Sequence, residues 1–381
     1  MSAISVLLLI LVFGNAATAQ NSNSSSVDPC KDQVELYCKE ESTAGDTRGI
    51  TKCLMKNEER LSVQCKQELQ RLVQASRQTM PLGGGPLGSL AGLTGAASQI
   101  PSLSYEGRLI PSSNETPSFF DNNLNISFPI YKTESETYSA TLVGGHFHLS
   151  EPILLDSGTN VPTDFYRTDI GLGYSRKLSA QKTLGVRGTM GYLGDRFTSK
   201  TQSYSISANY SFPGAKENSS WVLMVMMSNN SPLGTFIPIP GFFYIYRTST
   251  FTGLFGLPVA SMQWTPVHPW SFSFSLFGPQ IKAETSYGAI DKIQVYTGFG
   301  WKQQKYLVSE RQNEDDRLTV EEKTAEIGLR KPLFQGVFSE IQAGYSFDRS
   351  IYQGEGLFNR DDGYADLDSS WYLKWSIKFV F

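Results

Sequence analysis

The stretch that decides the fold is Trp371-Tyr-Leu-Lys-Trp-Ser-Ile-Lys-Phe-Val-Phe381, at the end of the 381-residue chain. Side chains of an extended strand point alternately to opposite faces, so every second residue shares a face. One face carries Lys374 and Lys378, which a helix of about 3.6 residues per turn would place among the aromatic residues. The stretch therefore predicts a β-strand with one face for water and one for hydrocarbon. The apolar face consists of Trp371, Leu373, Trp375, Ile377, Phe379 and Phe381.

This stretch resembles the terminal strand of bacterial outer-membrane β-barrels, which ends in an aromatic residue and is read by the barrel-assembly machinery. The resemblance implies an assembly signal at Trp375, Ile377, Phe379 and Phe381. It also implies two partners, outer-membrane lipid and the assembly machinery, and a location in the cell outer membrane.

Similar alternation recurs throughout residues 102–381. Between Ser203 and Phe212, aromatic and aliphatic residues alternate with serines and an asparagine. Half-buried strands of soluble sandwiches also alternate, but their polar face carries Lys and Glu, whereas here it carries mostly Ser, Asn, Gly and Gln. Together with an aromatic content of 12%, this pattern predicts an all-β fold, a closed antiparallel transmembrane barrel.

The length of the barrel region suggests about 12 strands, with 14 as the alternative, if each strand and turn takes about twenty residues. The segment from Pro238 to Pro279 breaks the count, because its prolines interrupt short apolar runs. It fits two strands, one bent strand or an inward-folded segment. Loops 310–316 and 352–368 are expected on the extracellular side, and the turn at 331–334 on the periplasmic side.

The amino terminus predicts export. An apolar run from Ile4 to Phe13 precedes Ala17-Thr-Ala19, so residues 1–19 are interpreted as a signal peptide and 20–28 as a flexible leader. The first residues lack Lys and Arg, and a signal anchor is the alternative. The net charge of −3 offers no basic field for nucleic acid, so we exclude that partner.

Residues 29–78 are expected to form a small α-helical module with two disulfides, because an exported protein meets an oxidising compartment. The sequence allows three pairings, and a helical hairpin would favour Cys38 with Cys53 and Cys30 with Cys65. The spacing lacks a Cys-x2-Cys pair and a nearby histidine, which argues against zinc. The spacing resembles one cysteine-rich repeat of the Golgi apparatus type. That resemblance implies a binding or spacer module with a periplasmic partner.

Two further segments have distinct composition. Residues 79–101 are rich in Gly, Ala, Leu and Pro, and are interpreted as a linker, with insertion of their leucines into the barrel mouth as the alternative. The proline-rich stretches at 237–244 and 256–270 resemble an uncharacterised family of bacterial outer-membrane barrels over residues 120–381. The resemblance implies the barrel fold and the outer membrane, and no activity.

His146 and His148 share one face of a predicted strand, which we expect to face the lumen. His148-Leu-Ser150 resembles the His-x-Ser of outer-membrane lipid A deacylases, but Glu151 stands where those enzymes have Asn. The histidines could form a metal pair, yet the sequence shows no third ligand. We therefore predict no catalytic residue, no metal and no cofactor.

Charged residues on the polar faces are expected to line the lumen, either in salt bridges or as a pore lining that selects solutes. The favoured function is a non-enzymatic envelope protein, either a passive channel or a structural component. The alternatives are a lipid-modifying hydrolase using His148 and Ser150, and a periplasmic binding module anchored by the barrel. The predicted lining comprises Arg167, Asp169, Arg187, Glu322, Glu326, Arg330, Glu340, Lys374 and Lys378.

Overall fold

The computed structural model describes most of the chain after residue 29. The chain divides into two compact units, Met1–Met80 and Pro81–Phe381. The predicted signal peptide and leader, and nearly all of the predicted linker, lie outside the described residues. The described residues are 30–39, 47–66, 100–113, 116–179, 181–216, 218–231, 234–278, 280–289, 292–311, 313–334, 336–356, 360 and 363–381.

The first unit is a small helical module containing α2 (Lys31–Tyr37), α4 (Thr47–Lys56) and the 3-10 turn η1 (Glu58–Arg60). Its disulfides join Cys30 to Cys65 and Cys38 to Cys53, the pairing that a helical hairpin favours. A core this small cannot stabilise a fold alone. A cross-link closing a loop of 15 residues adds about 3 kcal/mol by restricting the unfolded chain.

Among the described residues, no helix is both long and apolar enough to cross a membrane.

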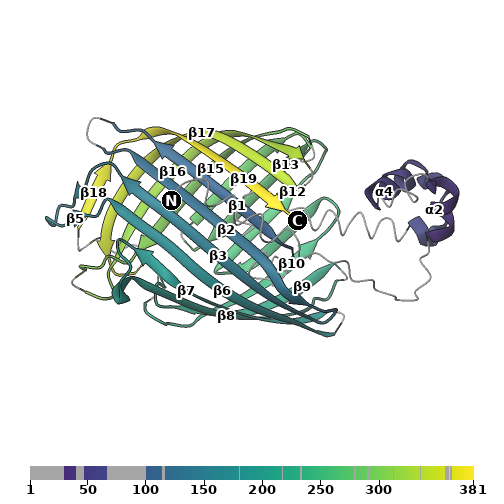
Figure 1. The fold of residues 1–381 in the computed structure, drawn as a ribbon, viewed down its shortest axis with the longest axis horizontal. Helices are drawn as coiled ribbons and strands as arrows, with labels where there is room; N and C mark the ends of the chain where they lie inside the picture. The colour runs from purple at the N-terminus through teal and green to yellow at the C-terminus, as the bar shows by residue number, and fades with distance from the viewer. Residues whose placement is uncertain are drawn as a thin grey trace. The chain divides into compact units, whose positions relative to one another are not determined.

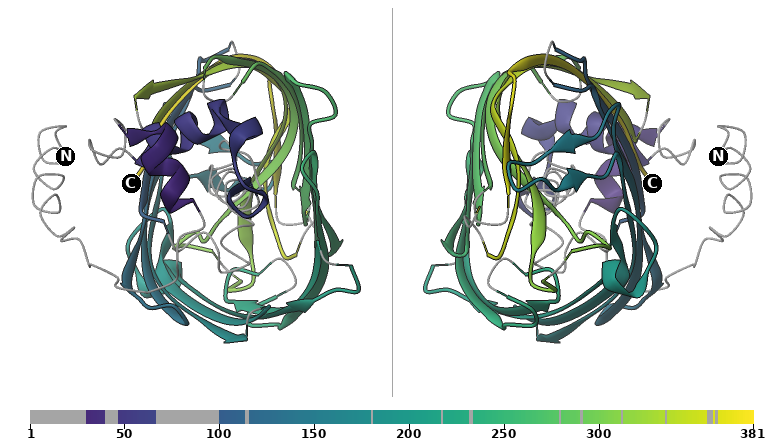
Figure 2. Two further views of the ribbon diagram at one scale, coloured as in Figure 1. Left: turned by 90° about the vertical axis from the view of Figure 1, so that its right-hand side faces the viewer. Right: turned by 90° about the vertical axis from the view of Figure 1, so that its left-hand side faces the viewer.

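The second unit is an antiparallel sheet closed on itself (Figures 1 and 2). Strand β1 pairs with β2 on one side and with β19 on the other, and Ser102 lies opposite Val380. The strands in the ring are β1 (Ser102–Ile110), β2 (Phe119–Lys132), β3 (Glu136–Leu149), β6 (Asp164–Ser179), β7 (Lys182–Gly194), β8 (Gln202–Pro213), β9 (Ser219–Ser228), β10 (Ile239–Arg247), β11 (Phe251–Leu257), β12 (Val259–Trp264), β13 (Trp270–Phe277), β14 (Gln280–Tyr287), β15 (Gln294–Tyr306), β16 (Arg317–Phe334), β17 (Val337–Gly354), β18 (Tyr364–Leu367) and β19 (Ser370–Val380). The pair β4 (Ile153–Leu154) and β5 (Asn160–Val161) and the turn η3 (Ser199–Thr201) lie outside the ring.

The prediction of 12 to 14 strands is wrong, because the described residues form a barrel of 16 strands. β18 and β19 both pair with β17 and occupy one position in the ring. The error arises mainly in the segment from Pro238 to Pro279, which contains four short strands, β10 to β13. Strands of six to nine residues need less sequence than the twenty residues assumed for each.

Strands β9 to β11 also lack the alternation of apolar and polar residues that identifies a half-buried strand. In β9, Leu223 and Val225 are exposed on the outer face, while Val222 and Met224 are buried on the inner face. Because both faces are apolar, no period of two marks the strand. Inner residues of β9 to β12 form one apolar cluster: Val222, Met224, Phe243, Ile245, Leu254 and Val259.

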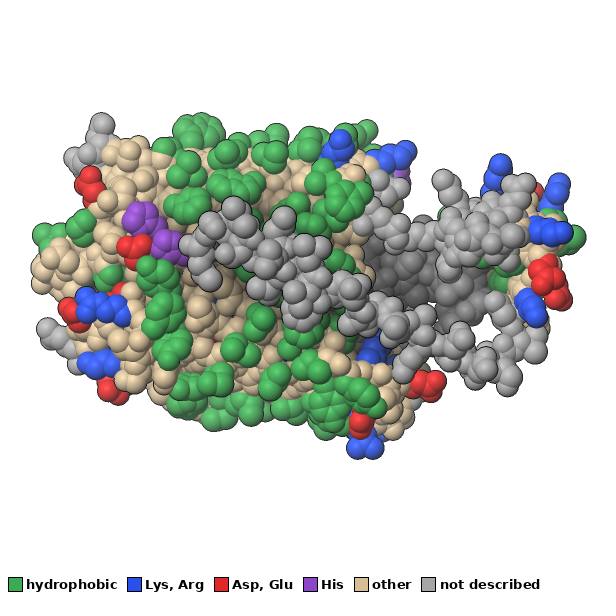
Figure 3. Space-filling view, in the orientation of Figure 1, with side chains coloured by type: hydrophobic (Ala, Val, Ile, Leu, Met, Phe, Trp, Pro, Cys, Tyr) green, Lys and Arg blue, Asp and Glu red, His purple; other side chains and the backbone are tan. Residues whose placement is uncertain are grey.

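The outer surface of the barrel carries a broad apolar zone, visible in green in Figure 3. On β19, Trp371 and Leu373 are exposed on this surface, whereas Tyr372 between them is buried inside. The same alternation places Ile170 and Leu172 of β6 outside. An apolar exterior around a polar interior is the pattern of barrels that face lipid.

The two ends of the barrel differ. The end that carries Ser102 and Val380, called here the terminus end, has mostly short turns, such as residues 133–135 between β2 and β3. The other, called the far end, carries longer connections, and an apolar cluster occupies part of its interior. Members of this cluster come from both halves of the ring: Ile110, Phe119, Phe147, Leu149, Ile153, Leu155, Val161, Phe165, Tyr306, Leu318, Val320, Ile351, Leu367 and Tyr372.

Candidate functional site

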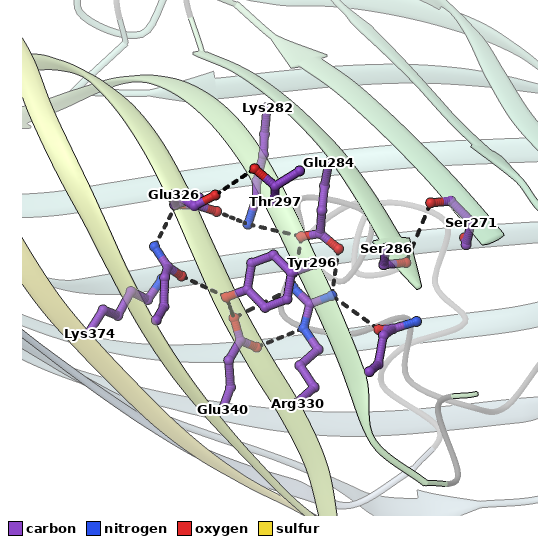
Figure 4. A network of polar contacts seen from close by, with 12 residues as sticks. Ser271, Lys282, Glu284, Ser286, Tyr296, Thr297, Glu326, Arg330, Glu340 and Lys374 are labelled. Atoms are coloured by element: carbon purple, nitrogen blue, oxygen red, sulfur yellow. Dashed lines mark hydrogen bonds and ion pairs between the residues drawn. The ribbon is translucent and has the colours of Figure 1, made fainter. Parts of the chain in front are cut away.

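The interior between the two ends contains a connected network of ion pairs on β14 to β17 (Figure 4). Arg330 of β16 lies at its centre. Its two terminal nitrogens lie 2.5 and 2.8 Å from the carboxylate oxygens of Glu284, and its Nε donates to Glu340 at 3.0 Å. These side chains are largely buried, with 8 to 13% of their surface exposed. One guanidinium therefore pairs with both carboxylates, and Lys282 lies 3.7 Å from Glu284 as a second cation.

Tyrosines connect this centre to the neighbouring strands. The Arg330 guanidinium lies 3.9 Å from the ring centroid of Tyr296, whose hydroxyl donates to Glu340 and also contacts the Gln342 side chain at 2.9 Å. Tyr372 of β19 donates to Glu326 at 2.9 Å. The network thus continues from β14 to the closing strand, and it fixes these strands relative to one another.

Two glycines make room for the tyrosine rings. Tyr296 lies over Gly328, and Tyr372 lies over Gly344, so a methyl group at either glycine would overlap the ring. Each ring therefore lies flat along the inner wall, with its hydroxyl directed at the carboxylates.

Replacing Gly344 with alanine is expected to lower the free energy of unfolding by about 1–3 kcal/mol, because Tyr372 must move and lose its contact with Glu326. The measurement is the denaturant midpoint of the refolded barrel in lipid vesicles. Gly144→Ala is the matched control, since nothing lies within 4 Å of a Cβ built there. Equal midpoints for the two variants would contradict the role of Gly344.

Nearer the far end, Arg108 of β1 and Glu322 of β16 form a buried bidentate pair. Ser346 donates to the same carboxylate at 2.7 Å, and the guanidinium lies 4.2 Å from the Tyr372 ring centroid. The cavity beside this pair has a volume of about 10 Å³, which is room for a single water molecule. The interior is tightly packed here.

The wall formed by β6 to β8 is more open. Arg167 pairs with Asp169 at 2.8 Å, but half of the arginine side chain is exposed. Arg187 donates to Thr141 at 2.9 Å, and no ion pair of Arg187 is found among the described residues. The inner residues of β8 are all half-buried, and they are Ser203, Ser205, Ser207, Asn209 and Ser211. This wall presents small hydroxyl and amide groups to the lumen.

Two other predicted lining residues lie on the inner face of β19, where Lys374 is opposite Gln342 of the network and Lys378 lies nearer the terminus end. Lys374 of β19 pairs with Glu106 of β1 at 2.9 Å. Lys378 lies on the same face of β19, and within the described part of the chain it has no ion pair. Sequence reasoning missed Glu284 and Lys282, although their alternation with Ile281 and Ala283 could have identified them.

The segment 307–316, which follows β15, crosses the far end. β15 and β7 lie half the ring apart in the strand order, yet Leu307 donates its backbone N–H to Leu193 at 2.9 Å. Asp195 then accepts two hydrogen bonds from Ser309, from the backbone N–H at 2.7 Å and from Oγ at 2.6 Å. Both residues are buried. We call residues 307–316 the crossing segment.

Arginines hold the other end of the crossing segment. Arg311 donates to the backbone oxygens of Lys200 and Val308, and burial lowers its pKa while the charge of Glu314 opposes that shift. Arg317 donates to the backbone of Asn229 at 2.7 Å. Asp315, in the loop 310–316 that is expected on the extracellular side, accepts a hydrogen bond from the Thr235 hydroxyl at 2.9 Å.

The expectation that His146 and His148 face the lumen is wrong. Phe147 and Leu149 belong to the buried apolar cluster inside the far end, so the histidines on the alternate positions face outward. The prediction assumed that apolar residues always face lipid, but the apolar filling of the far end reverses the two faces there. Figure 3 shows histidine side chains beside an acidic one on the outer surface.

Asp164 lies beside the two histidines and forms a group of three with them, and it was not predicted from the sequence. Its Oδ1 lies 2.8 Å from Nε2 of His146 and 2.9 Å from Nδ1 of His148. The sequence feature that could have identified it is its position as the first residue of β6, the strand that follows β3 in the ring. Ser150 accepts a hydrogen bond from the Ser118 backbone, and among the described residues none joins it to His148. The hydrolase hypothesis thus gains an acidic partner for His148 but no contact with the serine.

No family model and no curated protein matches the chain, so neither the cysteine-rich repeat nor the uncharacterised barrel family is supported by a match. Solved barrels are similar at low sequence identity. An outer-membrane channel from Pseudomonas putida F1 has a TM-score of 0.31 and 11% identity, covering 74% of this chain and 94% of that one. The NanC porin has a TM-score of 0.28 and 11% identity, covering 73% and 98%. The Bordetella BrkA β domain has a TM-score of 0.29 and 9% identity, covering 74% and 99%.

Proposed function

We propose that the chain is an outer-membrane protein whose barrel is a passive channel for small polar solutes, narrowed at its far end by the crossing segment. The observation that carries the proposal is the contrast between the two inner walls. Fixed charges on β14 to β17 are paired and buried, while the hydroxyl and amide groups of β8 are half-buried and available to a solute. A lumen lined in this way suits polar solutes and water.

The apolar exterior supports insertion in lipid, and we place the terminus end in the periplasm, as expected for an outer-membrane barrel. The cysteine-rich module precedes the first strand in sequence, and we place it on the same side. A periplasmic partner of that module belongs to this proposal, together with the assembly signal at the closing strand.

The test is ion conductance of the refolded full-length protein in planar lipid bilayers. Stepwise currents are expected, and Arg187→Gln should shift the selectivity toward cations, because Arg187 is a lumen charge with no ion pair among the described residues. The matched control is Arg176→Gln on the outer face, whose side chain is 56% exposed and pairs with Glu136. No current from a barrel that is shown to be folded by its electrophoretic mobility would refute the channel.

A further inference from the structure

Three potential metal ligands converge on the outer face of the barrel at the far end. His146 and His148 of β3 both contact Oδ1 of Asp164 on β6, and one ligand atom from each residue lies within 4.8 Å of the others. We propose that these three side chains bind a divalent transition-metal ion of the zinc class.

The backbone places the ligands without distortion. Residues two positions apart in a strand share a face, so His146 and His148 lie side by side on β3. In the register of β3 with β6, His148 is opposite Asp164. Directly opposed residues have Cβ atoms about 4.5–5.5 Å apart, within reach of side chains that share a metal ion. The sheet therefore supplies three ligands from two adjacent strands.

Neighbouring residues orient these side chains. Thr163 donates its hydroxyl to Oδ2 of Asp164 at 2.9 Å, which leaves Oδ1 directed at the imidazoles. The His146 ring stacks on Tyr166 with centroids 4.9 Å apart and an interplanar angle of 11°. Partners of this kind hold metal ligands in position and set their basicity. Each of the three side chains is 34 to 44% exposed, so an ion can enter from water.

The donor set selects the class of ion. Two imidazole nitrogens and one carboxylate oxygen suit zinc and its neighbours, whereas calcium and magnesium prefer sites made of oxygen. Ligands about 2.0–2.1 Å from a tetrahedral zinc ion lie about 3.3 Å from one another. Asp164 therefore needs to withdraw from each imidazole by about half an ångström. Binding requires the two imidazole nitrogens that now face the carboxylate to be unprotonated, which a neutral imidazole achieves by carrying its proton on the other ring nitrogen.

The experiment measures zinc binding to full-length, refolded protein without a polyhistidine tag, by isothermal titration calorimetry in detergent. Saturable binding of one zinc ion per chain is expected. His146→Ala, His148→Ala and Asp164→Asn should each weaken binding by at least tenfold, and Thr163→Val by about tenfold. His268→Ala is the control, because the third histidine lies in the turn between β12 and β13, and it should bind zinc as the parent does.

X-ray absorption at the zinc edge then identifies the ligands directly, with two imidazoles and one carboxylate expected. Binding that is unaffected by His148→Ala and Asp164→Asn, or the absence of any saturable binding, overturns the proposal. Asp164→Asn keeps the size of the side chain, and a folded barrel in that variant separates loss of the site from loss of the fold.

Discussion

Replacing Arg330 with methionine is expected to lower the free energy of unfolding of the barrel by about 3–5 kcal/mol, because it leaves buried carboxylates without their cation. Glu284 and Glu340 would then face each other in an interior where only 8 to 13% of their surface is exposed. Lys282 lies 3.7 Å from Glu284 and can replace only part of the lost interaction. The loss should appear as a lower denaturant midpoint for the refolded barrel in lipid vesicles.

The matched control for this prediction is Arg167→Met. Arg167 also forms an ion pair inside the barrel, with Asp169, but its side chain is 50% exposed. Its removal leaves one carboxylate unpaired, that of Asp169 at 13% exposure, instead of two, and water already reaches the arginine, so the cost should be clearly smaller than for Arg330→Met. A triple variant that combines Arg330→Met with Glu284→Gln and Glu340→Gln should recover much of the stability, because it removes the unpaired charges as well. Equal losses in the free energy of unfolding for Arg330→Met and Arg167→Met would show that the network stabilises the barrel no more than a single ion pair does.

The sequence predicts this fold best where alternation is undisturbed. In the closing strand the outer face is apolar and the inner face is polar, so the period of two identified both the strand and the outward position of Trp371. In β9 and β10 the inner residues are as apolar as the outer ones, and the strand count failed there. At the far end the inner residues Phe147 and Leu149 are apolar too, and for this reason His146 was wrongly predicted to face the lumen.

The functional features that sequence reasoning missed depend on long-range pairing. Asp195 and Ser309 are 114 residues apart, and only the closed ring brings β7 and the end of β15 together. Asp164 becomes a partner of the histidines through the register of β3 with β6. Residue types and spacing carry no information on such pairs, since neither the number of strands nor their register was known in advance.

The barrel combines a polar middle with a crossing segment at its far end, and these two features have different consequences. The ion network of β14 to β17 stabilises the wall and keeps its conformation fixed, because Arg330 has several buried partners. The crossing segment lies across the far end and is held by separate contacts, among them the two bonds from Ser309 to Asp195. Passage of solutes should therefore depend on the crossing segment more than on the charged wall.

Replacing Asp195 with alanine is expected to raise the open probability of the channel by at least tenfold. Hydrogen bonds to a charged group contribute about 1.5–3 kcal/mol each, and Asp195 accepts two from Ser309. A loss of about 1.4 kcal/mol already corresponds to a tenfold change in an equilibrium. Single-channel recording in planar bilayers measures the open probability, and amide hydrogen exchange over residues 307–316 reports the release of the segment independently.

Arg196→Ala is the control for Asp195→Ala. Arg196 also connects the end of β7 to the crossing segment, through an ion pair with Glu310 at 3.0 Å. That pair is 65 and 75% exposed, and the guanidinium lies 3.9 Å from Asp195, so its loss leaves both bonds from Ser309 in place and should change the current and the exchange rates far less than Asp195→Ala does. Adding Arg311→Ala to Asp195→Ala removes the contacts to Lys200 and Val308 and should open the channel further. Faster exchange without any increase in current would show that the segment moves but does not obstruct the lumen, and the proposed narrowing at the far end would then be wrong.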